Sequence, residues 1–142
     1  SDYEITHRNV YTINQRVAKK FRHGRVLLAG DAAHLNNSIG GMGLNGGIHD
    51  AINAADKIIK IWQGEADETS LDIYDIQRRT TTHEFTQAQT IANKKRLEAK
   101  DAQTRKKNLA ELKEMALDPT RAKKFMMGTS MLSAVRRAAT LG

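Results

Sequence analysis

The chain has 142 residues, a formal net charge of +7 and no cysteine. This length allows one domain with its own hydrophobic core, and the lack of cysteine excludes disulfides and thiol chemistry and fits a cytoplasmic location. No apolar run approaches the roughly 18 residues of a membrane span, so we expect no integral membrane segment. Its mean hydropathy of −0.58 is polar for a compact domain and predicts helices that pack on a partner surface.

The first predicted element is a short buried strand. Residues 26–29 form a continuous apolar run that Gly30 ends, as in a strand covered on both faces, and a weaker pattern at 10–13 adds at most one more strand. Asp31 follows the carboxyl end of the strand, the edge at which open α/β sheets bind ligands. Its carboxylate can accept hydrogen bonds from sugar or ribityl hydroxyls. We therefore predict a ligand contact at Asp31; the alternative is that it only caps a turn.

A glycine-rich segment and an amphipathic helix come next. Five glycines lie at positions 40, 41, 43, 46 and 47, where the missing side chains let backbone N–H groups approach a flat or charged ligand. The helix starts near Gly43, and its unpaired N–H groups favour an anion or an electron-rich carbonyl. We therefore predict an anion and dinucleotide site, with a ligand-free turn as the alternative. Apolar spacings of three and four predict a helical stripe that packs on a sheet: Leu44, Ile48, Ala51, Ala55, Ile58 and Trp62.

After Gly64 the pattern becomes helical. Residues 71–117 contain neither proline nor glycine, which predicts two long helices or one helix interrupted near Asp101. One apolar face comprises Leu71, Tyr74, Phe85, Ala88, Ile91 and Ala92, and another comprises Leu109, Leu112 and Met115.

Two further helices complete the chain. Residues 118–119, Asp-Pro, are an N-cap and a first helical residue, and we expect Gly128 to end the helix that they begin. Ser130 can cap a last helix that runs through Ala139. We assign the three nearby methionines to packing, with a methionine-rich interface as the alternative: Met126, Met127 and Met131.

The central motifs resemble those of one flavoprotein family. GDAAH at residues 30–34, then Gly41-x-Gly43-x-Asn45, then Asp50-Ala51 are similar to the second FAD-binding motif of the class A flavoprotein monooxygenases, the FAD-dependent aromatic hydroxylases. Residues 11–25 also resemble the lead-in to this motif, and the region from residue 71 onward resembles the family's C-terminal part.

The resemblance implies contacts with FAD. Asp31 matches the aspartate that hydrogen-bonds the ribityl chain, and residues 41–43 match the loop beside the isoalloxazine ring. The next two positions match backbone N–H groups that point at flavin N1 and the C2 carbonyl, in agreement with the helix-dipole argument. No catalytic residue is assigned. The predicted cofactor-binding residues are Asp31, Gly41, Met42, Gly43, Leu44 and Asn45.

The resemblance also implies an overall fold and an activity. The parent enzyme is α/β, with a Rossmann-like FAD-binding domain and a substrate sheet, whereas this chain is mainly α-helical with one or two short strands. Residues 1–64 are expected to end the FAD-binding domain, and residues 65–142 to form a helical C-terminal region. The implied reaction hydroxylates a small aromatic substrate with oxygen and NADH or NADPH, and a homodimer is a candidate assembly. Because no G-x-G-x-x-G motif for the ADP half is present, we expect a C-terminal portion that works with the enzyme's N-terminal remainder.

Three further features bear on the predicted function: the residue at position 38, a basic segment and the histidines. Ser38 stands where the family usually has proline, which loosens the loop before the glycines. Seven lysines and arginines lie between residues 94 and 107, but acids share their helix and aromatic residues are absent, so we expect no nucleic-acid binding. His34 is expected to be a hydrogen-bonded structural residue, and no metal site is expected. The alternatives are another FAD-dependent oxidoreductase of the same fold and a non-enzymatic helical interaction module.

Overall fold

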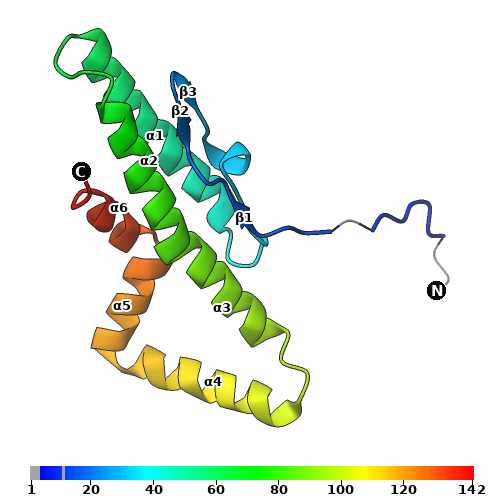
Figure 1. The fold of residues 1–142 in the computed structure, drawn as a ribbon. Coiled ribbons are helices and arrows are strands. Elements are labelled where there is room, and N and C mark those ends of the chain that lie inside the picture. The colour runs from blue at the N-terminus through cyan, green and yellow to red at the C-terminus, as the bar shows by residue number, and fades with distance from the viewer. Residues whose placement is uncertain (1–3, 11) are drawn as a thin grey trace.

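The computed structural model describes residues 4–10 and 12–142, so Tyr11, where the motif lead-in begins, lies outside the described residues. It is mainly helical, as predicted, with four very short strands rather than one or two (Figure 1). In chain order the elements are β1 (Arg16–Val17), β2 (Arg22–His23), β3 (Val26–Leu27), the 3₁₀ turn η1 (Gly30–Ala32), β4 (His34–Leu35), α1 (Met42–Trp62), α2 (Ser70–Thr81), the π-helical segment η2 (Thr82–Gln87), α3 (Ala88–Leu97), α4 (Ala102–Leu117), α5 (Pro119–Thr129) and α6 (Leu132–Ala138).

The four strands form two antiparallel pairs. β1 pairs with β4, and β2 pairs with β3 through a turn in which Gly24 adopts a φ of 59°. The prediction of a strand covered on both faces at residues 26–29 is therefore wrong, since β3 is half of a two-stranded ribbon and Val26 is 62% exposed. The described residues at 10, 12 and 13 form no strand.

Helices α1 and α2 lie side by side and form the centre of the molecule (Figure 1). The predicted apolar stripe of α1 is exposed, with Leu44 at 77% and Trp62 at 90%, so its prediction as a buried face is wrong. The physical reason is that α1 packs on α2 and η1 through a different face, and no sheet among the described residues covers the stripe. The buried residues recur every four positions: Met42, Gly46, Asp50 and Ala54.

Helix α2 continues through η2 into α3 without a break. Its inward side begins with Leu71 and Tyr74, as predicted, but Ala88, Ile91 and Ala92 are exposed, in contrast to the prediction. Most buried positions beyond Tyr74 are polar, and the hydroxyls of some of them donate to carbonyl oxygens of their own helix, which makes their burial possible. These buried polar residues are Arg78, Thr81, Thr82, Thr86, Gln87 and Thr90.

The predicted break near Asp101 is confirmed, and the two-helix alternative is the one observed. The Asp101 carboxylate accepts a hydrogen bond from the Thr104 N–H at 2.7 Å and caps α4. Asp118 caps α5 in the same way, with Pro119 as the first helical residue, also as predicted. Together these two caps fix the corners of the frame that α3, α4 and α5 form in Figure 1.

The end of α5 differs from the prediction. The helix continues past Gly128 to Thr129, because Gly128 keeps a helical conformation, and Ser130 is its C-cap. Met131, rather than Ser130, occupies the N-cap of α6, with a left-handed φ of 61°. Packing explains only part of the methionine cluster, since Met131 is buried against Met42 and Ala134 whereas Met126 is 62% exposed.

The hydrophobic core of the described residues consists of two small clusters. One joins the strands to the two central helices, and the other joins the start of α1 to α6. Among the residues described, none of the helices combines the length and apolarity that a bilayer crossing requires. The clusters are Phe21, Ala33, Ala54 and Tyr74 in the first, and Met42, Met131 and Ala134 in the second.

Candidate functional site

A cavity of about 480 Å³ lies between the Gly-Asp turn and the first half of α1. It brings together three of the predicted cofactor-binding residues, Asp31, Gly43 and Leu44, whereas Gly41, Met42 and Asn45 are not part of its lining. The lining is small and mostly apolar: Ala29, Gly30, Asp31, Gly43, Leu44, Gly47, Ile48 and Ala51.

Asp31 lies at the middle of the turn η1, at one edge of this cavity. The turn requires glycine at Gly30, whose φ is 59°, and the Ala33 N–H closes it by donating to the Gly30 carbonyl at 2.8 Å. Asp31 is exposed, and its carboxylate forms no hydrogen bond or ion pair with any other residue that the structure describes. An ionised carboxylate in this position is free to accept hydrogen bonds from a ligand.

The start of α1 forms another edge of the cavity. Gly41 is the N-cap with a φ of 64°, and its N–H donates to the Ser38 carbonyl at 3.1 Å. The N–H groups of residues 42–44 therefore lack partners within the helix, and they carry the positive end of its dipole. Asn45 is the fourth helical residue, where bonding within the helix begins, and its Nδ2 donates to the Gly41 carbonyl at 2.8 Å.

Among the predicted residues, Met42 and Gly43 contribute in different ways. The Met42 side chain is buried in the core with Met131 and cannot reach the cavity. A Cβ on Gly43 would meet only the Asn36 side chain, at an ordinary contact distance of 3.5 Å. Packing within the chain therefore does not require glycine at this position, and its missing side chain leaves the cavity wall open to a flat group.

Two of the five glycines, Gly46 and Gly47, have a packing role. Gly46 and Gly47 lie inside α1 rather than in a loop, so their prediction as part of the ligand loop is wrong. A Cβ on Gly47 would approach the Gly30 Cα to 3.2 Å, and one on Gly46 would approach the His34 Cε1 to 3.0 Å. These glycines let the Gly-Asp turn and β4 lie directly against the helix.

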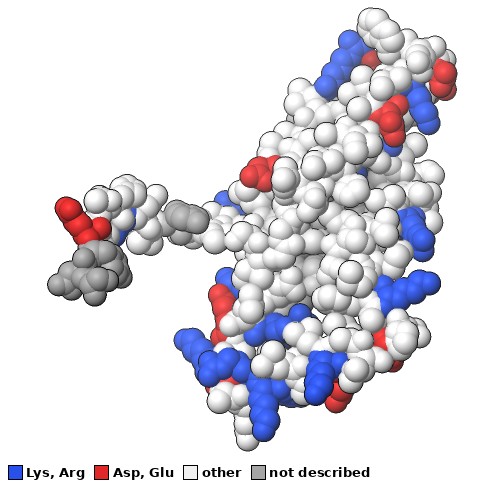
Figure 2. Space-filling view, turned by 180° about the vertical axis from the view of Figure 1, so that it is seen from behind, with Lys and Arg blue, Asp and Glu red and all other residues white. Residues whose placement is uncertain are grey.

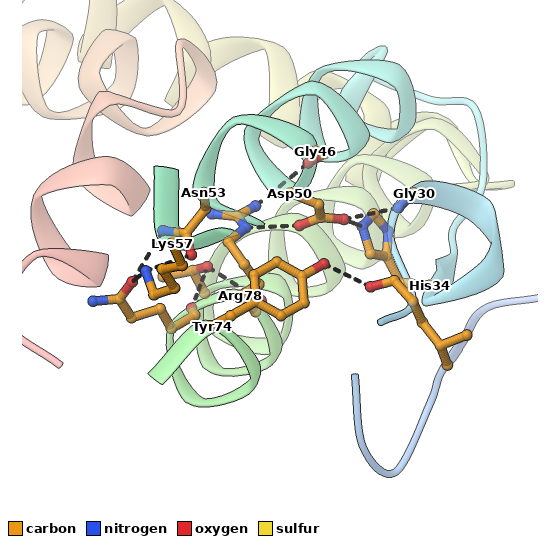
Figure 3. Close-up of polar contacts among 11 residues, drawn as sticks. Gly30, His34, Gly46, Asp50, Asn53, Lys57, Tyr74 and Arg78 are labelled. Atoms are coloured by element: carbon orange, nitrogen blue, oxygen red, sulfur yellow. Dashed lines mark hydrogen bonds and ion pairs between the residues drawn. The ribbon is translucent and has the colours of Figure 1, made fainter. Parts of the chain in front are cut away.

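A buried polar network lies beneath the cavity (Figure 3). Asp50 on α1 is fully buried, and its Oδ2 accepts from the Gly30 N–H and lies 2.9 Å from His34 Nε2. Its Oδ1 accepts from Arg78 Nε at 2.7 Å. Burial acts to raise the pKa of Asp50, but the hydrogen bonds from His34 and Arg78 outweigh it and hold the pKa below its ordinary value. The carboxylate is thus ionised, and His34 Nε2 must donate to it.

The sequence indicated only part of this network. His34 is confirmed as a hydrogen-bonded structural residue, and its ring also stacks on Phe21 with centroids 6.1 Å apart. Asp50 entered only as a motif match, without its role as an acceptor. Arg78 was missed; the available signal was its place one helical turn after Tyr74 on the inward side of α2, where a lone arginine needs a buried acid.

The loop before the glycines is anchored despite the serine at position 38. The Asn37 side chain is buried, and its Nδ2 donates to Gln15 Oε1 at 2.8 Å and to the Thr90 carbonyl at 3.1 Å. Its Oδ1 accepts from the Ile39 N–H at 3.1 Å. Hydrogen bonds to α3 and to the chain before β1 therefore restrain the segment in which a proline was expected.

Comparison with known proteins agrees with this geometry. A family model described as FAD binding domain matches residues 1–89. The chain is 38% identical over 134 residues to para-nitrophenol 4-monooxygenase from Pseudomonas sp. (strain WBC-3), which covers 94% of this chain and 33% of that relative. It is 42% identical over 91 residues to 3-(3-hydroxy-phenyl)propionate/3-hydroxycinnamic acid hydroxylase from Mycolicibacterium vanbaalenii, covering 64% of this chain and 16% of that relative.

A solved structure shows the same arrangement of elements. The crystal structure of p-nitrophenol 4-monooxygenase PnpA from Pseudomonas putida DLL-E4 superposes with a TM-score of 0.75 and 36% identity, covering 81% of this chain and 29% of that one. The chain thus spans about a third of the length of the monooxygenases that it matches over most of its own length. Since the family model covers more than half of the chain, the chain belongs to the FAD binding domain family, as its resemblance to the class A flavoprotein monooxygenases predicted.

Proposed function

We propose that this chain supplies part of the FAD site of an aromatic-ring monooxygenase. The observation that carries the proposal is that the partner-free carboxylate of Asp31 and the unpaired N–H groups at the start of α1 border one cavity. The residues present suit FAD: an exposed carboxylate suits ribityl hydroxyls, and the open wall at Gly43 suits a flat ring.

Each side of the cavity has a distinct role in this proposal. Asp31 accepts hydrogen bonds from the ribityl chain and fixes the register of the cofactor. The N–H of Leu44, at the positive end of α1, would stabilise negative charge on the pyrimidine edge of the bound ring system. This stabilisation favours the reduced form of the cofactor and raises its reduction potential.

The proposed reaction is hydroxylation of a small aromatic compound. Bound FAD supplies the redox chemistry, taking electrons from NADH or NADPH and using them to activate oxygen. The printed names of the matched relatives, a para-nitrophenol monooxygenase and a hydroxyphenylpropionate hydroxylase, support an aromatic substrate. Within this reaction, the described residues bind and orient the cofactor, and the turn and the start of α1 shield it from water.

Substitution of Asp31 by alanine in the FAD-loaded protein tests the proposal. Loss of a charge-assisted acceptor costs about 1.5 to 3 kcal/mol, so the Kd for FAD should rise roughly 10- to 150-fold. Asp56→Ala, at an exposed acid on α1, is the control and should leave the Kd unchanged. Flavin fluorescence titration measures both, and circular dichroism checks the fold.

The chemistry is tested on the same preparations. We expect oxygen consumption that depends on NADH or NADPH and matches the amount of hydroxylated aromatic product. An unaltered FAD affinity in a folded Asp31→Ala variant would reject Asp31 as a cofactor ligand. Substrate oxidation without oxygen incorporation would instead reject the monooxygenase and favour another flavin oxidoreductase.

A further inference from the structure

The carboxylate of Asp50 joins the Gly-Asp turn and the adjacent β4 to α2 (Figure 3). It lies on α1, and it accepts from Gly30 in the Gly-Asp turn, from His34 in β4 and from Arg78 on α2. Both oxygens are occupied, and the group is fully buried. It is therefore not itself available to a ligand.

One of these contacts holds the residue that precedes Asp31. The Gly30 N–H belongs to the residue just before Asp31, and its bond to Asp50 Oδ2 is 2.9 Å long. Gly30 also lies in close backbone contact with Gly47 on α1. The turn that carries Asp31 is thus attached to α1 within about two helical turns of the N–H groups at the start of the same helix.

Helix α2 supports the arrangement from behind. Arg78 Nε binds Oδ1 of Asp50, which leaves Oδ2 turned toward the Gly-Asp turn, and Arg78 Nη2 lies 3.4 Å from the Gly46 carbonyl. The Tyr74 hydroxyl donates to the Leu28 carbonyl at 2.6 Å, on the chain that enters the turn. Two residues one helical turn apart on α2 therefore hold the chain where it enters the turn, Tyr74 directly and Arg78 through Asp50.

We propose that Asp50 is a positioning residue for the cofactor. Its carboxylate sets the distance between the Asp31 carboxylate and the start of α1, so that both reach one bound FAD at the same time. The inference rests on the proposed function, because it concerns FAD, but it assigns a task to a residue that does not touch the ligand. Arg78 orients Asp50 and acts only through it.

A double-mutant cycle between Asp31 and Asp50 tests this proposal, with the Kd for FAD as the measured quantity. If Asp50 acts through Asp31, Asp50→Asn should raise the Kd about tenfold in the protein with Asp31 and by less than about twofold in the Asp31→Ala background. A residue with only a general structural role would produce the same factor in both backgrounds. Asp56→Asn, an exposed acid on the same helix, is the matched control.

A second variant provides a rescue and guards against misfolding. In Asp50→Asn the new amide must place its NH₂ group against a donor, either Arg78 or the pair Gly30 and His34. With Arg78→Gln added, that NH₂ can donate to the glutamine carbonyl while the amide oxygen still accepts from Gly30. The double variant also leaves no unpaired buried charge. We therefore expect it to fold and to recover most of the FAD affinity.

The possible results separate the two proposals. Equal losses in both backgrounds, or no rescue in a folded double variant, overturn the positioning role while leaving the Asp31 contact intact. No loss in Asp31→Ala overturns the Asp31 contact and the positioning role together. Unfolding of both Asp50 variants also overturns the positioning role, because the network would then serve stability alone.

Discussion

Gly30 and Gly47 lie where the Gly-Asp turn packs on α1, and neither glycine is replaceable without cost. Gly30 needs its positive φ, whereas Gly47 has ordinary helical geometry and is limited only by space. A Cβ at Gly47 would lie 3.2 Å from a backbone atom, which cannot swing aside as a flexible side chain can. The whole turn must then move by a few tenths of an ångström.

We expect Gly47→Ala to weaken FAD binding more than it weakens the fold. Overpacking costs about 1 kcal/mol or more, which corresponds to roughly a fivefold rise in the Kd for FAD, and the higher helix propensity of alanine partly offsets it in stability. Gly128→Ala is the control, since its Cβ would meet no atom within 4 Å in α5. Titration with FAD and thermal unfolding measure the two effects; equal Kd values for both variants would contradict the spacing role of Gly47.

At this scale the sequence indicated Asp31, whose carboxylate borders the cavity, but not what holds it. Asp31 follows a recognisable apolar run and precedes a glycine cluster, so its neighbourhood is local in the sequence. The contacts of Gly30 with Gly47 and Asp50 join residues 17 and 20 positions apart, and they depend on how the turn lies on the helix. The glycines were predicted to let a ligand approach, whereas at Gly47 the group that approaches is the backbone of the Gly-Asp turn.

At the scale of elements, the helix boundaries were more predictable than the helix faces. Caps are local chemistry, which explains the correct predictions at Asp101 and Asp118. In α1 the large apolar side chains marked one stripe, but the contact with α2 uses Gly46, Asp50 and Ala54. The small side chains allow close packing, and the buried carboxylate is stabilised by its three donors.

The π-helical segment η2 explains why the predicted buried side of α2 and α3 is wrong beyond Tyr74. Up to Tyr74 the predicted apolar side of α2 is buried, but one wider turn at Thr82–Gln87 shifts the phase of every later position. A prediction with a constant period of 3.6 residues therefore places Ala88 and Ile91 on the inward side, whereas both are exposed. No residue in THEFTQ indicates a π turn in advance.

The cavity between α1, α2 and α6 predicts a pH effect on stability. His49 lines it, and burial, with the nearby positive charge of Arg78, lowers the pKa of His49 below its ordinary value of 6.5. The unfolded chain then binds a proton more readily than the folded chain. The contribution of His49 is present above about pH 6.5 and is lost as the pH falls through the lowered pKa.

Substitution of His49 by glutamine should reduce this dependence. We expect the urea midpoint of the wild type to fall between pH 7 and pH 5, and to fall less in His49→Gln, because glutamine does not titrate. His23→Gln, at an exposed position in β2, should behave like the wild type. A variant whose midpoint falls as steeply as that of the wild type would exclude His49 as the source.

Across the whole molecule, charge divides the chain in two. Residues 1–89, which match the family model, carry ten lysines and arginines against eleven acids, whereas residues 90–142 carry 13 against five. Figure 2 shows the Lys and Arg side chains gathered at the end of the molecule that contains α4, a helix without buried residues. The positive net charge therefore belongs to residues 90–142, and its attraction for anions acts away from the Gly-Asp cavity and weakens with salt.

From the exposed stripe of α1 we predict the tryptophan fluorescence of this chain when it is produced on its own. Trp62, the sole tryptophan, lies at the end of the stripe and is 90% exposed. Its fluorescence emission should resemble that of free tryptophan in water, acrylamide should quench it efficiently, and unfolding in urea should shift it little. N-acetyltryptophanamide is the reference for full exposure. A blue-shifted emission that moves to the red in urea would contradict an open stripe.

In that case gel filtration would show whether copies of the chain cover the stripe for one another, since apolar patches of this kind associate in water. Ile58→Lys, which charges the stripe next to Trp62, should then restore the exposed emission.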